Sequence, residues 1–471
     1  MWRRAYLLLL AVRLYFALSP SYIHPDEHFQ GPEVIAGHVF NWPTHSTWEF
    51  TSTAPIRSYF PLWMVYGLPL KFLAQITPGE TPAPLFTFYF LRILFFLLSF
   101  VLEDWALQEL TSPRQRFLGL TLLASSYVTW TYQTHTFSNS IETICVLWAL
   151  VFLERIRRSS FVPWGTSLLL GFTCIFGLFN RITFPVFLLI PGLRLLQSIV
   201  QRPLLIVPLG ISAAATAAIA VYIDTSHYNG LTVTPINNLL YNTDTANLAT
   251  HGLHPRWTHM LVNLPTLLGP IFLLRPALTP ALMSAVGGIL ALSALPHQEA
   301  RFLLPCVPLL LASVSFRRSA LVKQIFVVTW VLFNTVAGVF FGIYHQAGVV
   351  PAQDFIASTN ATKVVFWKTY NPPTWILGEK AGRIETINAM GAPMEKIKTL
   401  LRCERLNDEV YLAAPLMTKN LSEIGGKKVW ETKSHIGLDD LDWEGDGIRG
   451  TIERVVFERG LGVWEVKCDT L

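Results

Sequence analysis

The sequence predicts an all-α protein that crosses a membrane many times and ends in a small soluble α+β domain. Hydrophobic residues make up 52% of the 471-residue chain and charged residues only 14%, whereas about 25% of the residues in a soluble domain are charged. The charges are also unevenly placed, because residues 1–350 hold 20 basic and 13 acidic residues while residues 351–471 hold 16 and 18. We therefore expect the first region to lie in lipid and the second in water.

The membrane region is expected to contain about 9–12 transmembrane helices, since a span needs about 20 apolar residues. Arg3 and Arg4 precede the first apolar run and should hold the N-terminus in the cytosol. No small-residue cleavage site follows this run, which favours an uncleaved first span. The chain has no dense basic tract, which argues against a nucleic-acid partner. The candidate spans, several of them short, are residues 5–22, 58–76, 84–103, 116–132, 141–153, 163–179, 183–200, 203–223, 258–274, 278–295, 301–316 and 322–344.

The chain divides at the change in composition into a membrane domain, residues 1–345, and a soluble domain, residues 346–471. Two loops of the membrane domain, residues 23–57 and residues 224–257, are too long to be simple turns. We expect these two loops to carry the function, because binding and catalytic residues are concentrated on loops.

The tail is expected to fold as a small α+β domain in the lumen. Alternating polar and apolar residues predict strands at 363–367 and 462–467, and residues 395–402 have the pattern of a helix. The N-glycosylation sequons at Asn360 and Asn420 both lie in this tail, which favours a lumenal location because such sites are modified in secretory compartments.

The sequence predicts no metal site. Its five cysteines show no CxxC spacing, and the histidines of the 224–257 loop do not stand at a zinc-ligand spacing. Cys403 and Cys468 share the tail and would form one disulfide if the tail is lumenal; free thiols are the alternative. Whether Asp26 and Glu27 bind a divalent cation stays open. The alternative is that arginine alone stabilises the departing phosphate.

The first long loop opens with the segment His24-Pro-Asp-Glu-His-Phe-Gln30, which places two carboxylates and two histidines just beyond the first span. Pro25 restricts the backbone and should keep the acids at the membrane surface. A carboxylate there could take a proton from a sugar hydroxyl while a lipid phosphate departs. An ordinary polar interfacial loop is the alternative. The catalytic candidates are Asp26 and Glu27, and the adjacent substrate-binding candidates are His24 and His28.

Polar and ionisable side chains also stand beside the apolar runs, where they are costly and usually functional. Histidine, asparagine and glutamate suit sugar hydroxyls, and arginine suits phosphate through its two-pronged hydrogen bonding. The alternatives are hydrogen bonds between helices and, for Arg181, an anchor at the cytosolic interface. The substrate-binding candidates are His135, Asn139, Glu142, Arg181, His297, Glu299 and Arg301.

The second long loop is rich in Asn, His and Thr, unlike a flexible linker, which would be rich in Gly and Ser. Such a loop could form a lid over an acceptor glycan. Further substrate-binding candidates are Asn238, His254 and Arg256 in this loop and Arg57 at the end of the first loop.

Four segments in this order resemble the dolichyl-phosphate-mannose-dependent α-mannosyltransferases of the endoplasmic reticulum, glycosyltransferase family 22. The segments are His24-Pro-Asp-Glu-His-Phe-Gln30, Thr136-Phe-Ser-Asn-Ser-Ile-Glu142, Asn180-Arg-Ile-Thr-Phe184 and His297-Gln-Glu-Ala-Arg-Phe-Leu-Leu-Pro305. The resemblance covers residues 1–345. Residues 237–265 are similar to the family members that add the fourth mannose to glycosylphosphatidylinositol (GPI) precursors. Ala300 departs from the proline that relatives often carry.

The resemblance implies a GT-C fold in the endoplasmic-reticulum membrane, with the active site in the first lumenal loop. The donor would be dolichyl-phosphate β-mannose and the acceptor a trimannosyl GPI glycolipid; no protein partner is implied. An α-1,2 linkage made from a β donor requires inversion, so Asp26 would be the single general base, with Glu27 as second choice or support. Arg181 and Arg301 would hold the donor phosphate. A lipid-phosphate donor removes the need for a nucleotide site or other cofactor, and the sequence has no Gly-rich phosphate loop.

Three alternatives remain open at this point, one of which is a non-catalytic assembly subunit. Related members of the same family add the third GPI mannose or a mannose of the N-glycan precursor. A lipid or sugar transporter is an alternative of another class, but it predicts inverted repeats with broken spans at matching positions, and the sequence has no such repeat.

Overall fold

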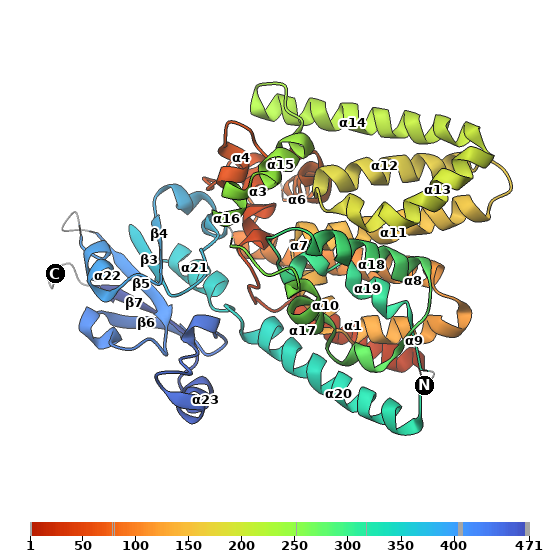
Figure 1. Cartoon of the computed structure of the whole chain (residues 1–471). Helices are drawn as coiled ribbons and strands as arrows, with labels where there is room; N and C mark the ends of the chain where they lie inside the picture. Colours follow the sequence, from red (N-terminus) through yellow and green to blue (C-terminus); the bar gives the residue numbers. More distant parts are fainter. Residues whose placement is uncertain are drawn as a thin grey trace. The chain divides into compact units, whose positions relative to one another are not determined.

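The computed structural model describes residues 2–77, 79, 81–250, 252–316, 318–403 and 408–466. The chain divides into two compact units, which we call the helical unit and the sheet unit and describe separately (Figure 1). Most of the first long loop, residues 23–46, belongs to the same unit as the tail, and residues 47–57 belong to the helical unit. The helical unit comprises Met1–Leu14, Thr47–Val65 and Ile93–Val336, and the sheet unit comprises Tyr15–Ser46, Tyr66–Arg92 and Ala337–Leu471.

The helical unit consists of helices joined by short connections, with one two-residue antiparallel pair of strands, β1 (Arg275–Pro276) and β2 (Val314–Ser315). Its first helix runs on into the sheet unit. The α-helices are α1 (Trp2–Ala17), α4 (Trp48–Thr51), α5 (Tyr59–Leu62), α8 (Asp104–Leu110), α9 (Pro113–Ala124), α10 (Tyr127–Trp130), α11 (Ser138–Arg158), α12 (Trp164–Asn180), α13 (Leu189–Gln201), α14 (Ile206–Tyr228), α15 (Thr234–Thr243), α16 (Thr245–Thr250), α17 (Leu264–Leu268), α18 (Pro280–Ser293), α19 (Cys306–Leu311) and α20 (Ala320–Val339).

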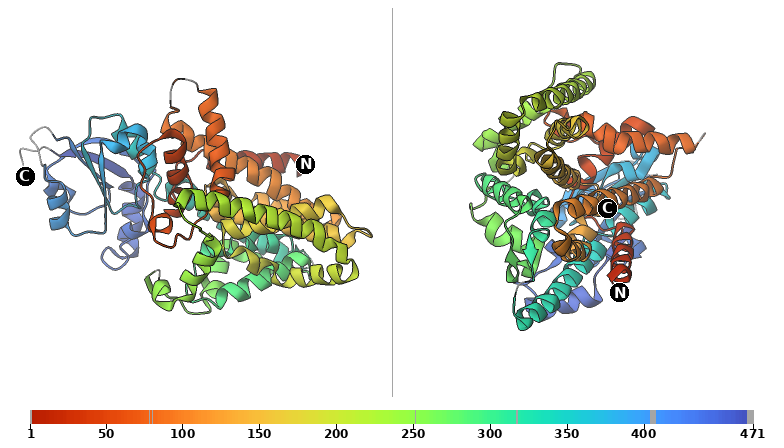
Figure 2. Two further views of the ribbon diagram at one scale, coloured as in Figure 1. Left: turned by 90° about the horizontal axis from the view of Figure 1, so that it is seen from above. Right: turned by 90° about the vertical axis from the view of Figure 1, so that its right-hand side faces the viewer.

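Close helix packing forms the centre of this unit. Helix α12 packs against both α11 and α14 (Figures 1 and 2). Gly171 on α12 permits the approach, because a Cβ atom there would lie 2.6 Å from the carbonyl oxygen of Leu209 on α14; small residues have this role between membrane helices. The outer surfaces suit contact with lipid. Large exposed apolar side chains there include Leu193, Leu196 and Val200 on α13, Ile211 and Ile219 on α14, and Val328, Val331 and Leu332 on α20.

The multi-pass character of the chain is confirmed. Among the described residues, four helices are long and apolar enough to cross a membrane, and a fifth span results if a helix pair bent by 111° is counted as one. All twelve predicted runs contain helix, but residues 301–316 are divided between a 3-10 helix, Ala300–Leu303, and α19. The number of spans therefore stays a prediction. The four helices are Pro84–Leu110, Phe184–Gln201, Pro203–Tyr228 and Ala320–Tyr344, and the bent pair is Tyr127–Thr134 with Ser138–Arg158.

The sheet unit contains a five-stranded mixed sheet in the order β4-β3-β5-β7-β6. Strand β3 runs parallel to β4 and β5, and β7 runs antiparallel to β5 and β6. The predicted α+β character of the tail is confirmed. The strands are β3 (Lys363–Trp367), β4 (Glu385–Met390), β5 (Val410–Pro415), β6 (Lys427–Thr432) and β7 (Leu461–Val466), and the helices are α2 (Asp26–Phe29), α3 (Pro32–Phe40), α6 (Leu68–Ile76), α7 (Pro84–Leu98), α21 (Val349–Ala357), α22 (Met394–Leu400) and α23 (Gly447–Phe457).

Alternation along the central strand gives the sheet two apolar faces. Val364 and Phe366 belong to a core cluster that includes Val349 of α21, and Val365 belongs to another that includes Ile397 of α22. The sheet is therefore covered on both sides, which explains why β3 is almost continuously apolar.

The tail also carries the predicted modification sites. Asn360 and Asn420 are both exposed, as glycosylation requires. Cys403 is disulfide-bonded, whereas Cys468, its predicted partner, lies outside the described residues, so this pairing stays a prediction.

Candidate functional site

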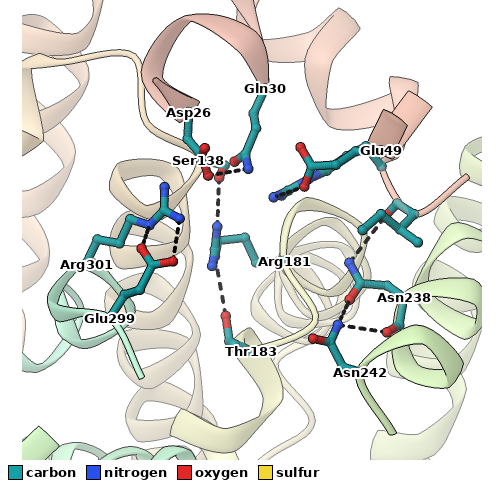
Figure 3. Close-up of polar contacts among 12 residues, drawn as sticks. Asp26, Gln30, Glu49, Ser138, Arg181, Thr183, Asn238, Asn242, Glu299 and Arg301 are labelled. Carbon is teal, nitrogen blue, oxygen red and sulfur yellow. Dashed lines mark hydrogen bonds and ion pairs between the residues drawn. The ribbon is translucent and has the colours of Figure 1, made fainter. Parts of the chain in front are cut away.

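The acidic motif of the first loop forms a single helical turn, α2, directly after Pro25. The Asp26 carboxylate accepts a hydrogen bond from the Gln30 side chain one turn later (Figure 3), and its other oxygen lies 3.4 Å from Nδ1 of His24. The Asp26 side chain is 21% exposed, so a substrate hydroxyl can approach it. Its accessibility suits a general base, and the hydrogen bond from Gln30 holds the carboxylate in position.

Glu27, the adjacent acid, has different surroundings. It is fully buried; its Oε1 accepts a hydrogen bond from the Ile23 backbone N–H at 2.8 Å, and its Oε2 lies 3.6 Å from Nη2 of Arg92 on α7. Arg92 also donates to the Ser21 carbonyl oxygen at 2.7 Å. These contacts tie the start of the loop to α7, and they favour a supporting role for Glu27 over proton transfer.

A second buried carboxylate, which the sequence analysis did not single out, joins the first loop to the tail within the sheet unit. Glu33 accepts hydrogen bonds from the backbone N–H groups of His45, at 3.0 Å, and Trp375, at 3.2 Å, and from the Thr374 hydroxyl. Burial raises the pKa of Glu33 to about 7, although these three donors act in the opposite direction.

His28 lies in an aromatic cluster. Its Nδ1 accepts a hydrogen bond from the Trp375 indole at 3.3 Å, and its ring stacks on Phe88 and meets Tyr22 edge to face. Because the His28 side chain is almost completely buried, we interpret it as a support for α2. His24, by contrast, is partly exposed beside Asp26.

In the helical unit, Arg181 forms the centre of one polar cluster. Its Nε lies 3.1 Å from Glu142 Oε2, and its Nη1 donates to the Ser138 hydroxyl at 3.0 Å. Thr183 donates to the same glutamate. Figure 3 shows Arg181 between Ser138 and Thr183. The N-terminal end of α11 and the C-terminal end of α12 thus hold a paired cation.

Arg301 forms the centre of a second cluster in this unit. It donates to Glu299 at 2.9 Å (Figure 3), and His297 Nε2 lies 2.9 Å from the same carboxylate oxygen. The hydrogen bond to Glu299 raises the pKa of His297. Asn139 joins this cluster by donating to the Arg301 carbonyl oxygen at 3.1 Å.

The Phe302 ring links the two arginines. The guanidinium carbon of Arg181 lies 5.5 Å from the centroid of this ring, and that of Arg301 lies 5.8 Å from it. Both distances are within the range of a cation–π contact. The structure therefore brings together two of the predicted phosphate-binding residues, which stand 120 positions apart in the sequence.

The 224–257 segment contributes to the helical unit through α15 and its C-terminal end. Asn238 donates to the Ile56 carbonyl oxygen at 3.2 Å, and the neighbouring Arg57 pairs with Glu49 at 2.9 Å (Figure 3). The His254 backbone N–H donates to the Pro296 carbonyl oxygen, next to His297, at 2.8 Å. Thus α15 packs on the end of the first loop, and the segment around His254 packs on the His297 cluster.

Two further predicted residues have other surroundings. His135 is fully buried and stacks on Phe137, which favours a structural role in the core. Arg256 is exposed. Among the described residues, no group of three or more His, Cys, Asp or Glu side chains has an arrangement that could hold a metal ion.

Further buried polar residues that the sequence analysis did not single out include Arg92 and Asp224. Asp224 on α14 accepts hydrogen bonds from the hydroxyls of Ser58 and Thr234, both at 2.9 Å. Each stands near or within an apolar run, which is the signal that could have identified it.

The chain is similar to a family of known enzymes over most of its length. Residues 4–378 match the model of the Alg9-like mannosyltransferase family. GPI mannosyltransferase 4 of Emericella nidulans is 43% identical, with 98% of each chain covered, and that of Yarrowia lipolytica is 38% identical, with 92% of this chain and 95% of the relative covered. GPI mannosyltransferase 4 of Saccharomyces cerevisiae is 40% identical over 78% of this chain and 75% of its own.

The fold also has a solved neighbour. ArnT from Cupriavidus metallidurans, crystallised with undecaprenyl phosphate, superposes with a TM-score of 0.51 over 98% of both chains, at 9% sequence identity. At this identity the likeness concerns the fold alone, and it confirms the expected GT-C architecture.

Proposed function

Because the chain belongs to the Alg9-like mannosyltransferase family and is therefore a membrane glycosyltransferase, we propose that it adds the fourth mannose to GPI precursors. The donor in this proposal is dolichyl-phosphate mannose, the acceptor is a trimannosyl GPI glycolipid, and the new linkage is α-1,2. The observation that carries the proposal is the near full-length identity, 43% and 38%, to two relatives that bear the name GPI mannosyltransferase 4.

Arg181 and Arg301 are the proposed ligands of the donor phosphate. Both contact the Phe302 ring, and each is held by one glutamate. An arginine fork binds phosphate oxygens strongly, and the paired glutamates orient the two guanidinium groups. ArnT, which has the same fold, was crystallised with undecaprenyl phosphate, and this supports a lipid-phosphate donor.

Asp26 is the proposed general base. In a single displacement, the acceptor hydroxyl oxygen forms a bond to C1 of the donor mannose while the bond from C1 to the phosphate oxygen breaks. The hydroxyl proton passes to Asp26, and dolichyl phosphate leaves with the bonding electrons. A positioned base of this kind contributes about 10²–10⁴-fold to the rate. The configuration at C1 inverts, as an α product from a β donor requires.

We place this chemistry in the endoplasmic-reticulum lumen. The two exposed asparagines of the tail sequons support a lumenal sheet unit, and Asp26 belongs to that unit. Glycan on Asn360 or Asn420, detected as a mobility shift that endoglycosidase H removes, is the expected result. A protease-accessible tail on the cytosolic side of sealed microsomes would contradict it.

The direct test is transfer by the purified chain from labelled dolichyl-phosphate mannose to defined GPI acceptors. The expected product carries a fourth mannose that an α-1,2-specific mannosidase removes. Transfer to a dimannosyl acceptor instead, or to an N-glycan precursor, would assign the chain to another branch of the family. Movement of labelled donor across a vesicle membrane, without transfer of mannose to an acceptor, would favour the alternative that the chain is a transporter.

A further inference from the structure

A polar groove of about 480 Å³ lies within the sheet unit, next to the turn that carries Asp26. Residues from the first loop form one wall, and the segment after residue 370 together with strand β4 forms the other. Its volume is within the range of small-molecule sites, about 300–1,000 Å³. The side chains on which the argument depends are Phe29, His45, Asn371, Thr374, Thr386 and Asn388.

The groove is held open by the buried carboxylate described above. Glu33 accepts a hydrogen bond from His45 on one wall and from Thr374 and Trp375 on the other. The Asn371 carbonyl oxygen accepts a further hydrogen bond from Tyr22 at 2.8 Å. A site whose walls are fixed in advance loses less entropy when a ligand binds.

The chemistry of the lining suits a neutral polyhydroxylated ligand. Threonine, asparagine and histidine side chains supply hydrogen-bond donors and acceptors, and no lysine or arginine is among the described residues that line the groove. The one lining carboxylate, Glu385, lies 3.4 Å from Lys363. A phosphate would find no cation there, whereas sugar hydroxyls would find several partners, and Phe29 offers an apolar ring for the carbon face of a sugar.

One lining group is left without a partner. The Thr386 hydroxyl is buried and has no hydrogen-bond partner among the described residues. Asn388 uses its side-chain oxygen to accept a hydrogen bond from the Met390 backbone N–H at 3.1 Å, and an amide has two N–H donors besides. A buried hydroxyl without a partner costs free energy, and a ligand hydroxyl would satisfy it.

The position of the groove identifies which sugars it would bind. Phe29 follows Asp26 by three residues in one helical turn, so the two side chains lie on the same side of α2. The donor brings a single mannose, whereas the acceptor carries several sugars behind the one that reacts. Only the acceptor therefore has further sugar residues that could occupy a groove one helical turn away from Asp26.

We propose that this groove binds the sugar residues of the acceptor glycan that precede the mannose being extended. This inference rests on the proposed function. The groove would then recognise the α-linked mannose arm of the acceptor, and the sheet unit would contribute to acceptor affinity as well as to catalysis.

The test measures the kinetics of the full chain in detergent, with acceptor and donor varied separately. Thr386→Val keeps the shape of the side chain and the strand propensity but removes the hydroxyl. The expected result is an acceptor KM raised about 2- to 10-fold, the effect of one neutral hydrogen bond, with kcat and donor KM unchanged. Thr386→Trp, which fills the groove, should raise acceptor KM further.

The matched control is Thr432→Val. It makes the same change on β6, at the opposite edge of the sheet, and should leave acceptor KM at the wild-type value. Unchanged acceptor KM in both Thr386→Val and Thr386→Trp would overturn the proposal, as would an equal effect of Thr432→Val.

Binding of a soluble linear α-mannotriose, followed by saturation-transfer NMR, separates this inference from the proposed function. Signals from the trisaccharide in wild type that disappear in Thr386→Trp support the groove even if wild type transfers no mannose to a GPI acceptor. If wild type transfers mannose but the trisaccharide signals are the same in both proteins, the groove proposal is contradicted and the proposed function is unaffected.

Discussion

The helical unit and the sheet unit bury charge in different ways. In the helical unit, buried arginines face carboxylates: Arg13 lies 3.0 Å from Glu103 and 3.4 Å from Asp104, and Arg181 lies 3.1 Å from Glu142. The sheet unit also holds one buried ion pair, Glu27 with Arg92 at 3.6 Å, but Glu33, beside the groove, is held by neutral donors, namely backbone N–H groups and a hydroxyl. Cations among apolar helices suit the phosphate of a lipid donor, whereas the neutral groups that Glu33 holds in place, such as His45 and Thr374 in the groove wall, suit sugar hydroxyls.

The difference indicates a division of labour within one enzyme. The proposed base and the proposed acceptor groove belong to the sheet unit, and the proposed phosphate ligands belong to the helical unit. Substitutions in the two units should therefore change different kinetic constants, and each prediction below tests one side of this comparison.

The largest effect is expected from Asp26→Asn. The amide keeps the shape of the carboxylate but cannot take a proton, so kcat should fall by about 10²–10⁴-fold while the protein folds normally. Initial rates at saturating donor and acceptor measure this. Asp354→Asn, at an exposed position of α21, is the control and should be fully active. A rate within tenfold of wild type for Asp26→Asn would exclude Asp26 as the general base.

Glu27→Gln should act on stability. The change leaves the buried Arg92 without its carboxylate, and removing one partner of a buried ion pair costs about 3–5 kcal/mol. We expect a lower thermal unfolding midpoint and less folded protein, measured by fluorescence during heating in detergent. Glu379→Gln, on the surface of the same unit, should change neither. Normal stability with abolished turnover would make Glu27 the base instead of a support.

Arg181→Lys and Arg301→Lys should each weaken use of the donor. Lysine keeps the charge but loses the fork and the contact with Phe302. The expected loss is about 10- to 100-fold in kcat/KM for dolichyl-phosphate mannose, with acceptor KM unchanged. Arg157→Lys, where the arginine pairs with Glu154 in the same unit, is the matched control. Raised acceptor KM with intact donor kinetics would reverse the assignment of the two units.

The smallest effect concerns pH. The pKa of Glu33 is about 7 in the folded protein, above its ordinary value of 4.5, so the folded state binds this proton more tightly than the unfolded state does. Its stabilising contribution is therefore complete below pH 4.5 and is lost as pH rises toward and through 7. The unfolding midpoint of wild type should fall across this window, and that of Glu33→Gln should fall less. An equal fall of the unfolding midpoint with pH in the two proteins would contradict this role of Glu33.

Much of the fold was accessible to sequence reasoning because membrane helices and strands leave local patterns. Each apolar run contains helix, and the alternating segments at 363–367 and 462–467 correspond to β3 and β7. What could not be predicted is which faces meet. A helix that is apolar on all sides gives no periodic signal, so the packing of α12 between α11 and α14 depends on shape, as at Gly171.

The site shows the same limit. The residue types and the order of the motifs identified Asp26, Arg181 and Arg301 as candidates. Hydrogen bonds between residues distant in sequence could not be predicted. Glu33 and Thr374, for example, are 341 positions apart, and no local pattern connects them. The difference in solvent exposure between Asp26 and Glu27 could not be predicted either, because two adjacent acids differ in exposure only once α2 packs against its neighbours.

The most direct measurement of the central claim is the identity of the GPI intermediate that accumulates when the chain is depleted from cells. The account predicts a trimannosyl intermediate, which wild-type chain clears on re-expression and Asp26→Asn does not. Accumulation of a dimannosyl intermediate, or of a truncated N-glycan precursor, would contradict it.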